Sequence, residues 1–146
     1  MNNTVCLCGS TRFAAQFDEA NRELSKRGLS IITISMSLER NASGSENEAG
    51  LKELLDLVHL NKILRADAVF VVGDGYIGRS TAREILWADM HGKPMVLQAL
   101  THSWDNAAHC LRHGHTVSNL PGKAKVVLGL APPADAMRAH HSGEAS

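Results

Sequence analysis

The sequence has no excess of charge of either sign. Its 15 lysine and arginine residues balance 15 aspartate and glutamate residues, so the formal net charge is zero. A protein that binds a nucleic acid polymer usually carries a broad positive surface, because it must neutralise closely spaced phosphates. The balanced charge therefore argues against nucleic acid polymers as partners.

The sequence also has no long apolar run. A helix that crosses a membrane needs about 20 consecutive apolar residues, and no stretch of this chain approaches that length. The chain does not begin with a basic segment followed by an apolar run, which is the pattern of a secretory signal. We therefore expect no membrane partner and a cytoplasmic location.

Cysteine is scarce, with three residues in all: Cys6, Cys8 and Cys110. An odd number of cysteines without a secretory signal predicts reduced thiols instead of a disulfide framework. Cys6 and Cys8 fall in an apolar run that predicts a buried strand, where cysteine is common.

Recognised metal motifs are absent as well. Among the eight histidines, His109 and His113 are four residues apart and could share one face of a helix, near Cys110 and His115. No third ligand follows at the spacing of a known zinc site, and the two N-terminal cysteines lie on a strand expected to be buried. We expect no metal ion and no organic cofactor.

Two common nucleotide-binding motifs are missing too. The chain has no Gly-x4-Gly-Lys-Ser/Thr phosphate loop. It also has no Gly-x-Gly-x-x-Gly fingerprint that opens a helix with an acidic residue about 20 positions later. These absences argue against ATP hydrolysis and dinucleotide redox chemistry.

What the sequence does contain is a regular alternation of strand and helix patterns. A length of 146 residues with 44% apolar content fits one domain. We place this domain at residues 1–130 and expect residues 131–146 to be a flexible tail. The predicted strands are residues 4–8, 29–34, 68–72, 95–100 and 125–130. The predicted helices are residues 13–27, 51–65, about 80–91 and 104–113, and the polar stretch 35–50 predicts a mobile loop.

This alternation predicts an α/β fold in a single domain. Strands that alternate with helices form right-handed crossovers and a doubly wound parallel sheet. We expect a flavodoxin-like (Rossmann-like) sheet of about five strands in the order 2-1-3-4-5. The first and third strands are then neighbours, and ligands bind beyond their carboxyl ends.

A glycine-containing loop follows each of these two strands. The first is Cys8-Gly9-Ser10-Thr11-Arg12, and the second extends from Gly73 to the helix near Ser80. Hydroxyl groups, an arginine and the N–H groups of a helix N-terminus can together hold one phosphate. We therefore predict a mononucleotide site, with Ser80 also serving as the N-cap of its helix. The predicted substrate contacts are Gly9, Ser10, Thr11, Arg12, Gly75, Tyr76, Gly78 and Ser80.

Glu84 gives this predicted site a reactive group. We expect it in the first turn of the helix that follows the second loop, beside the sugar phosphate. A carboxylate there can attack the anomeric carbon and form a glycosyl ester, as in retaining glycoside hydrolysis. The simpler alternative is that Glu84 only complements the dipole of its helix.

Several segments of the chain occur in a particular order and spacing within residues 5–97. They are Cys8-Gly9-Ser10-Thr11-Arg12, the stretch 55–67 with the strand 68–72 after it, Gly78-Arg79-Ser80-Thr81-Ala82-Arg83-Glu84, Ala88, and Gly92-Lys93-Pro94. Together they resemble the nucleoside 2-deoxyribosyltransferase and nucleotide N-glycosidase superfamily. The resemblance implies that Glu84 is the nucleophile and that Ser10, Arg12 and Ser80 bind a 5′-phosphate. It also implies a homodimer or a higher homo-oligomer.

Two positions depart from the pattern of that superfamily. His59 stands where better-known members have an aspartate that assists at the base or sugar, and Asp56 lies one turn earlier. Either residue could supply acid assistance, because an imidazole with a pKa of about 6.5 is a competent acid near neutrality. Cys6 replaces a frequent aromatic residue, which leaves the choice between ribose and deoxyribose open. Asp67, between a helix and a strand, is expected to be structural.

The sequence thus predicts an enzyme that hydrolyses the N-glycosidic bond of a nucleoside or deoxynucleoside 5′-monophosphate. The reaction would pass through a covalent intermediate on Glu84, with His59 and Asp56 as further catalytic residues, and would release the free base and a (deoxy)ribose 5-phosphate. One alternative is a nucleoside 2′-deoxyribosyltransferase, in which a second base instead of water takes the sugar. Another is a module that binds a nucleotide without turning it over.

Overall fold

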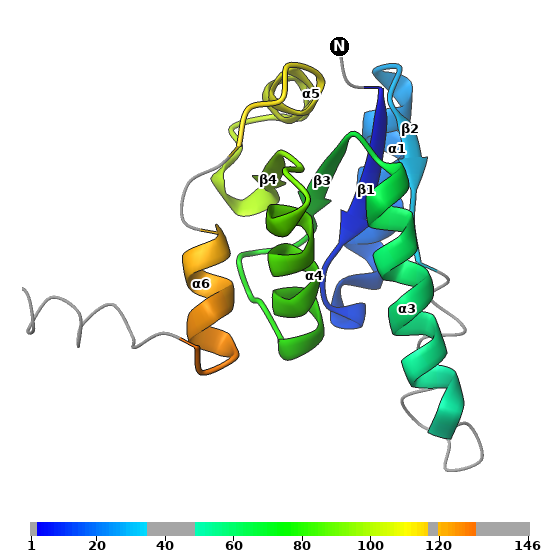
Figure 1. Cartoon of the computed structure of the whole chain (residues 1–146). Coiled ribbons are helices and arrows are strands. Elements are labelled where there is room, and N and C mark those ends of the chain that lie inside the picture. Colours follow the sequence, from blue (N-terminus) through cyan, green and yellow to red (C-terminus); the bar gives the residue numbers. More distant parts are fainter. Residues whose placement is uncertain (1–2, 35–48, 117–119, 131–146) are drawn as a thin grey trace, which may run out of the picture.

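The computed structural model describes residues 3–34, 49–116 and 120–130, and within them four strands form one parallel sheet between two layers of helices (Figure 1). The strands are β1 (Thr4–Cys8), β2 (Ser30–Ile32), β3 (Ala68–Val71) and β4 (Met95–Leu97). Their order is β2-β1-β3-β4, and every neighbouring pair is parallel. The predicted α/β class and the order of the first four strands are confirmed.

The register of β1 and β3 brings the two glycine-containing loops to the same edge of the sheet. Cys8, the last residue of β1, lies opposite Val71, the last residue of β3. The pairing continues one step further, because the Val72 N–H donates to the Cys8 carbonyl oxygen at 2.8 Å. The chain leaves both strands at this edge, so the segments that follow them start side by side.

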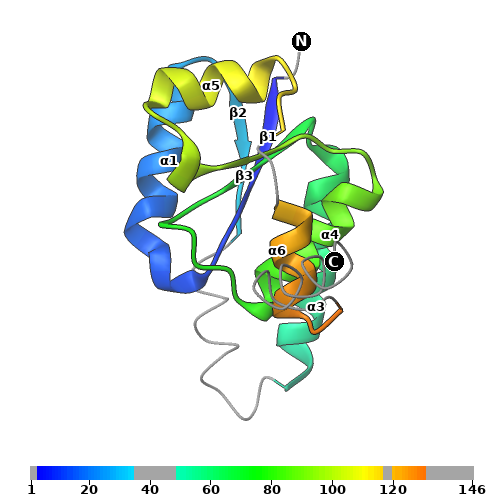
Figure 2. The same cartoon turned by 90° about the vertical axis from the view of Figure 1, so that its left-hand side faces the viewer.

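Helices cover both faces of the sheet. On one face lie α1 (Ala14–Lys26) and α5 (Trp104–Arg112). On the other lie α3 (Ala49–Arg65), α4 (Arg79–Met90) and α6 (Leu120–Val127), as Figure 2 shows. No described helix is both long and apolar enough to cross a membrane.

β1 sends its side chains to these two faces in alternation, as a strand must. Val5 and Leu7 join the apolar cluster beneath α1 and α5. Cys6 and Cys8 point to the opposite face, into the cluster beneath α3, α4 and α6. All four side chains are fully buried, so β1 contributes only hydrocarbon to one face and two thiols to the other.

The predicted fifth strand is wrong. Residues 125–127 belong to α6, and residues 128–130 form the turn that follows it. α6 buries Leu120 and Ala124 in the cluster that it shares with α4. A short apolar run has the same appearance in a strand and in a buried helix, which explains the error.

Three other predicted boundaries also need adjustment. β2 is shorter than predicted, and β4 ends at Leu97 because Gln98–Leu100 forms the 3-10 turn η3. Of the predicted mobile loop, residues 35–48 lie outside the described residues, while Ala49 and Gly50 begin α3. The predicted tail, residues 131–146, also lies outside the described residues.

Asp67 has the structural role that the sequence predicted. Its Oδ2 accepts hydrogen bonds from the backbone N–H groups of Thr4, at 3.0 Å, and Asn3, at 3.1 Å. These two hydrogen bonds, that of Thr4 first, hold the pKa of the Asp67 carboxyl below its usual value. The carboxylate therefore fixes the start of β1 at the edge of the sheet opposite the glycine-containing loops.

Candidate functional site

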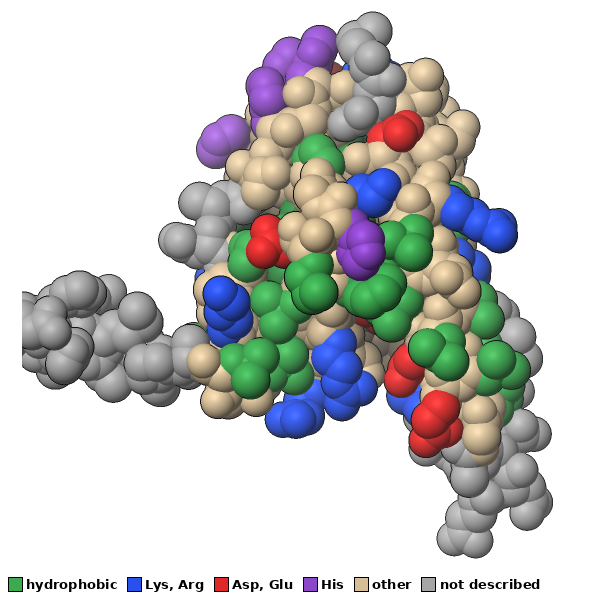
Figure 3. All heavy atoms as spheres, in the orientation of Figure 1, with side chains coloured by type: hydrophobic (Ala, Val, Ile, Leu, Met, Phe, Trp, Pro, Cys, Tyr) green, Lys and Arg blue, Asp and Glu red, His purple; other side chains and the backbone are tan. Residues whose placement is uncertain are grey.

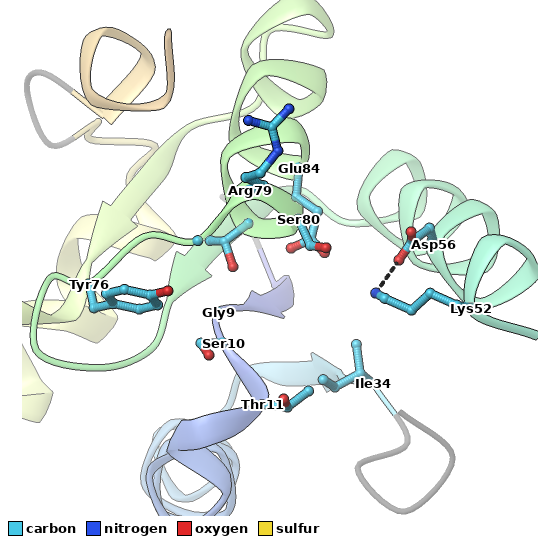
Figure 4. Close-up of a pocket in the computed structure, with 12 residues that line it drawn as sticks. Gly9, Ser10, Thr11, Ile34, Lys52, Asp56, Tyr76, Arg79, Ser80 and Glu84 are labelled. Carbon is cyan, nitrogen blue, oxygen red and sulfur yellow. Dashed lines mark hydrogen bonds and ion pairs between the residues drawn. The ribbon is translucent and has the colours of Figure 1, made fainter. Parts of the chain in front are cut away.

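A pocket of about 210 Å³ opens beyond the carboxyl ends of β1 and β3. Figure 4 shows Tyr76 on one side of it and Lys52 with Asp56 on the other, with the loop after β1 between them. The pocket is lined by Gly9, Ser10, Thr11, Ile34, Lys52, Asp56, Tyr76, Gly78, Arg79, Ser80, Thr81 and Glu84. The structure thus brings eight of the predicted site residues together, and Arg12, Gly75 and His59 do not line this pocket.

The loop after β1 can pass close to β3 only with a glycine at position 9. Gly9 has φ +146°, and a Cβ there would stand 2.9 Å from the carbonyl oxygen of Val72. Ser10 follows as the N-cap of the short 3-10 helix η1 (Thr11–Phe13), where its Oγ accepts the Arg12 N–H at 3.3 Å. This contact leaves the hydroxyl proton of Ser10 available to a ligand in the pocket.

The loop after β3 packs on the first loop through a second glycine. Gly73 has φ +117°, and a Cβ there would come within 2.6 Å of the Phe13 ring. Its N–H donates to Gln98 Oε1 at 2.9 Å, which holds the loop to the end of β4. Asp74 Oδ1 then accepts the Tyr76 N–H at 3.1 Å and turns the chain toward α4.

Arg12 and Tyr76 connect the two loops. The Arg12 guanidinium carbon lies 3.7 Å from the centre of the Tyr76 ring, a cation–π contact. The Tyr76 ring also meets the edge of Phe13, with 6.5 Å between the ring centres. Arg12 therefore supports the pocket wall through Tyr76, and the phosphate contact predicted for it stays a prediction.

The N-terminus of α4 opens into the pocket. α4 begins at Arg79 with Gly78 as its N-cap, so the predicted N-cap role of Ser80 is wrong. The first N–H groups of a helix have no intrahelical acceptor and attract an anion. Because the Ser80 side chain does not cap the helix, its hydroxyl can serve the pocket together with the N–H groups of the first turn.

Glu84 lies in the second turn of α4, one turn deeper than predicted, and lines the pocket. Its side chain is 14% exposed, and its Oε2 stands 3.5 Å from His59 Nε2. Within the described part of the chain, Oε2 is buried without a hydrogen-bond partner. A carboxylate in this state has lone pairs available for a ligand or an electrophile.

His59 lies behind Glu84 and away from the open pocket. Its side chain is 3% exposed, and its Nε2 is 3.4 Å from the sulfur of Cys8. Burial lowers the pKa of the His59 imidazole, but the close approach and the negative charge of the Glu84 carboxylate outweigh burial, so the pKa is raised overall. The geometry places His59 where it can position Glu84.

Asp56 lies on the opposite wall, on α3. Its Oδ1 accepts a hydrogen bond from Lys52 Nζ at 2.9 Å, one helical turn away. Asp56 also lines a smaller recess of about 40 Å³ beside Glu84 and Ser80. Lys52 and Arg79 are pocket residues that the sequence reasoning missed, although the four-residue spacing of Lys52 and Asp56 on a predicted helix was a usable signal.

Two thiols complete the buried surroundings of His59. The sulfur atoms of Cys6 and Cys8 and a ring nitrogen of His59 lie within 4.8 Å of one another. A hydrogen bond from Cys8 lowers the pKa of the Cys6 thiol, while that same hydrogen bond, and then burial, raises the pKa of Cys8. The sequence placed the cysteines on a buried strand, but it did not reveal that a helix residue 51 positions after Cys8 joins them.

The other predicted histidine group is on the surface. The ring centres of His109 and His113 are 4.4 Å apart, those of His109 and His115 are 5.5 Å apart, and all three residues are exposed near the C-terminal end of α5. Figure 3 shows histidine side chains gathered over this helix. Partial desolvation by the neighbouring side chains lowers the pKa of His113, and the charges of His109, His115 and Arg112 add to that effect. This group lies on the α1 and α5 side of the sheet, away from the pocket.

The arrangement as a whole can hold a small anion at the N-terminus of α4 and present a carboxylate to the group that the anion carries. It contains a nearly buried carboxylate, an imidazole behind it and a second carboxylate on the facing wall. No family model matches the sequence, and no curated protein is significantly similar to it. The functional conclusion therefore rests on the geometry of the site and on the motifs that it contains.

Proposed function

We propose that the protein hydrolyses the N-glycosidic bond of a nucleoside or deoxynucleoside 5′-monophosphate. The observation that carries the proposal is the place of Glu84. Its carboxylate is almost buried, lines the pocket, and has an oxygen without a hydrogen-bond partner in the described part of the chain. Such a group is suited to attack an electrophilic carbon.

The phosphate would bind at the N-terminus of α4. The N–H groups of its first turn and the hydroxyls of Ser80 and Ser10 provide donors, all from residues that line the pocket. Glu84 lies one turn into the same helix. A sugar that is held by its 5′-phosphate at the helix terminus would therefore have its ring near Glu84.

The reaction would take two steps. A Glu84 oxygen bonds to the anomeric carbon while the C–N bond breaks. The electron pair of the C–N bond leaves with the base. Water then attacks the glycosyl ester, which releases the sugar 5-phosphate and regenerates the carboxylate.

Asp56 and His59 take different parts in this scheme. Asp56 lines the pocket wall that faces Glu84, beside its ion-pair partner Lys52. In its protonated form Asp56 would donate a proton to the departing base, and its carboxylate would then take a proton from the attacking water. His59 contacts Glu84 from behind and does not line the pocket. We therefore assign to His59 the role of a positioning residue.

We also propose a homo-oligomer in which α3 forms the contact between copies of the chain. Leu54 and Leu57 on this helix are 55% and 60% exposed, although the helix also contributes His59 and Asp56 to the site. Figure 3 shows hydrophobic side chains over α3. A helix that is apolar on more than one face usually has a second packing partner. A dimer by sedimentation that becomes a monomer in Leu57→Lys would support this surface, and a wild-type monomer would contradict it.

The test of function is a chromatographic screen of ribo- and deoxyribonucleoside 5′-monophosphates for release of free base. The wild type should release base from at least one of them, and Glu84→Gln should not. Glu53→Gln is the matched control, because Glu53 is exposed on α3 and does not line the pocket. No release of base from any substrate would contradict hydrolysis.

The same screen separates the alternatives. Adding a foreign free base to the reaction would yield an exchanged nucleoside if the protein is a deoxyribosyltransferase, and the sugar phosphate alone if it is a hydrolase. Binding of a monophosphate by calorimetry without any product from wild type, and with equal affinity in Glu84→Gln, would identify a binding module.

A further inference from the structure

The buried group Cys6, Cys8 and His59 has the chemistry of a metal site. Its three donor atoms lie within 4.8 Å of one another. Cys8 Sγ lies 3.4 Å from His59 Nε2, and Glu84 Oε2 lies 3.5 Å from the same nitrogen. The group of mutually close donors consists of the two thiols and the imidazole, and Glu84 approaches it through His59 Nε2, so Glu84 is the side chain that could supply a fourth donor.

The separations suit a tetrahedral ion. Bond lengths of about 2.3 Å for sulfur and about 2.0–2.1 Å for nitrogen and oxygen put the donors of a tetrahedral zinc site about 3.4–3.8 Å apart. Two of the contacts already have this length. The other donors, Glu84 included, would have to close around the ion by side-chain rotation. Thiolate and imidazole donors favour Zn²⁺ over Mg²⁺ or Ca²⁺.

The fold explains why sequence spacing does not reveal this group. Cys6 and Cys8 point to the same face because they are two residues apart on a strand. α3 packs on that face and brings His59 to them. The nearly buried Glu84 then joins the group to the pocket, so an ion could enter past Glu84.

We propose that Cys6, Cys8 and His59, with Glu84 as the fourth ligand, bind Zn²⁺, and that the bound ion stops turnover. The second part rests on the proposed hydrolysis, since an ion that takes the lone pair of Glu84 leaves no nucleophile. Binding needs both sulfurs as thiolates, so up to two protons leave to solvent as the ion enters. The ion is an inhibitor in this scheme and takes no part in the reaction.

Cobalt(II) titration of the purified, chelator-treated and reduced protein tests the site directly. Co²⁺ should bind in one equivalent, with thiolate-to-cobalt charge-transfer absorption in the near ultraviolet and the strong visible bands of tetrahedral geometry. Addition of Zn²⁺ should abolish both the charge-transfer absorption and the visible bands. If the wild type gives no charge-transfer absorption, the proposal is overturned without the need for any variant.

Three alanine variants locate the site. Cys6→Ala and Cys8→Ala should each lower the affinity for Co²⁺ by at least about 100-fold, beyond the usual effect of an outer-shell partner. Cys110→Ala should leave the titration unchanged, because that half-buried thiol lies on α5. Circular dichroism shows whether each variant is folded. Charge-transfer absorption that survives in both N-terminal variants, or that is lost in Cys110→Ala, would contradict the assignment.

Further measurements test Glu84 as a ligand and distinguish the proposed metal site from the proposed hydrolysis. Glu84→Gln should lower the affinity for Co²⁺ by about 10-fold and change the visible bands. Binding at the surface histidines would instead give no charge-transfer absorption and would be lost in His113→Ala, which contradicts the proposal. If Co²⁺ binds as expected but no substrate is hydrolysed, the proposed function fails and the site stands. If hydrolysis proceeds and the charge-transfer absorption is absent, the proposed metal site fails and the proposed function stands.

Discussion

The two faces of the sheet are built from the same strands but bury different kinds of side chain. Beneath α1 and α5, the buried cluster consists of aliphatic and aromatic side chains such as Leu7, Phe17 and Phe70. Beneath α3 and α4, the buried layer contains two thiols and an imidazole, with the Glu84 carboxylate at its margin. Burying titratable groups costs free energy unless they are paired. Both clusters contain aliphatic side chains, but only the cluster beneath α3 and α4 adds buried groups that can titrate, and this is the face on which the proposed chemistry takes place.

The sharpest way to test this difference is to remove the charge of Glu84. Glu84→Gln keeps the size of the side chain but removes the nucleophile, so we expect hydrolysis to fall by at least about 10⁴-fold. The fold should persist, because the side chain lies at the edge of the core. Turnover and thermal unfolding are measured on the same sample, with Glu53→Gln as the control.

A substitution on the apolar face, beneath α1 and α5, should instead lower the stability of the fold. Leu7→Ala leaves a cavity in a fully buried cluster, and we expect it to lower the free energy of unfolding by about 2–5 kcal/mol. Cys8→Ala, one residue along β1, removes only one sulfur atom and should cost about 1 kcal/mol. Urea unfolding of both variants provides the comparison. Equal losses in the two would show that the faces are not specialised as we describe.

A substitution at the N-terminus of α4 should weaken substrate binding without changing the stability of the fold. Ser80→Ala removes one proposed hydrogen bond to a charged phosphate, worth about 1.5–3 kcal/mol, so KM for the monophosphate should rise about 10-fold or more. Stability should change little, since Ser80 is not the N-cap of α4. The unphosphorylated nucleoside is the control substrate, and an equal rise in its KM would contradict a phosphate role.

The smallest effect is expected at Asp67, which stabilises the end of β1 far from the site. Its pKa is lowered in the folded protein by the N–H groups of Thr4 and Asn3, so its contribution is present above about pH 4, the unfolded value. That contribution is lost as the pH falls below 4 and the carboxylate becomes protonated. Asp67→Asn should cost less than about 1 kcal/mol at pH 7 because the carboxylate is exposed.

The measurement for Asp67 is the urea midpoint of wild type and Asp67→Asn at several pH values. The gap between the two proteins should be present at pH 7 and should close in acid. A gap that stays constant with pH would contradict the assigned cause, and a change in turnover at pH 7 would show that the two ends of β1 are coupled.

The sequence was a sound guide where the pattern was local or repeated. The apolar run at β3 and the alternation of strands and helices were enough to predict the parallel sheet and the order of its first four strands. The glycines after β1 and β3 were enough to place the pocket, because parallel strands end at one edge. By contrast, the run at residues 125–130 was too short to distinguish a strand from the end of α6.

The contacts within the site could not be predicted in the same way, because they join elements far apart in the chain. Nothing local to His59 indicates that it packs behind Glu84 against Cys8, a contact that depends on how α3 lies on the sheet. The Arg12 guanidinium stacks on Tyr76, a contact that likewise depends on how the two loops come together in the fold. Ser80 was expected to cap α4, but the N-cap is Gly78, two residues earlier.

The most direct test of the account is to look for the covalent intermediate on Glu84. Acid-quenched protein that was mixed with its monophosphate substrate should be digested and analysed by mass spectrometry. We predict an added (deoxy)ribose phosphate mass on the peptide that contains Glu84, formed in wild type and Glu53→Gln and absent from Glu84→Gln. Full release of base by Glu84→Gln, or an adduct on a different residue, would contradict the central role of Glu84.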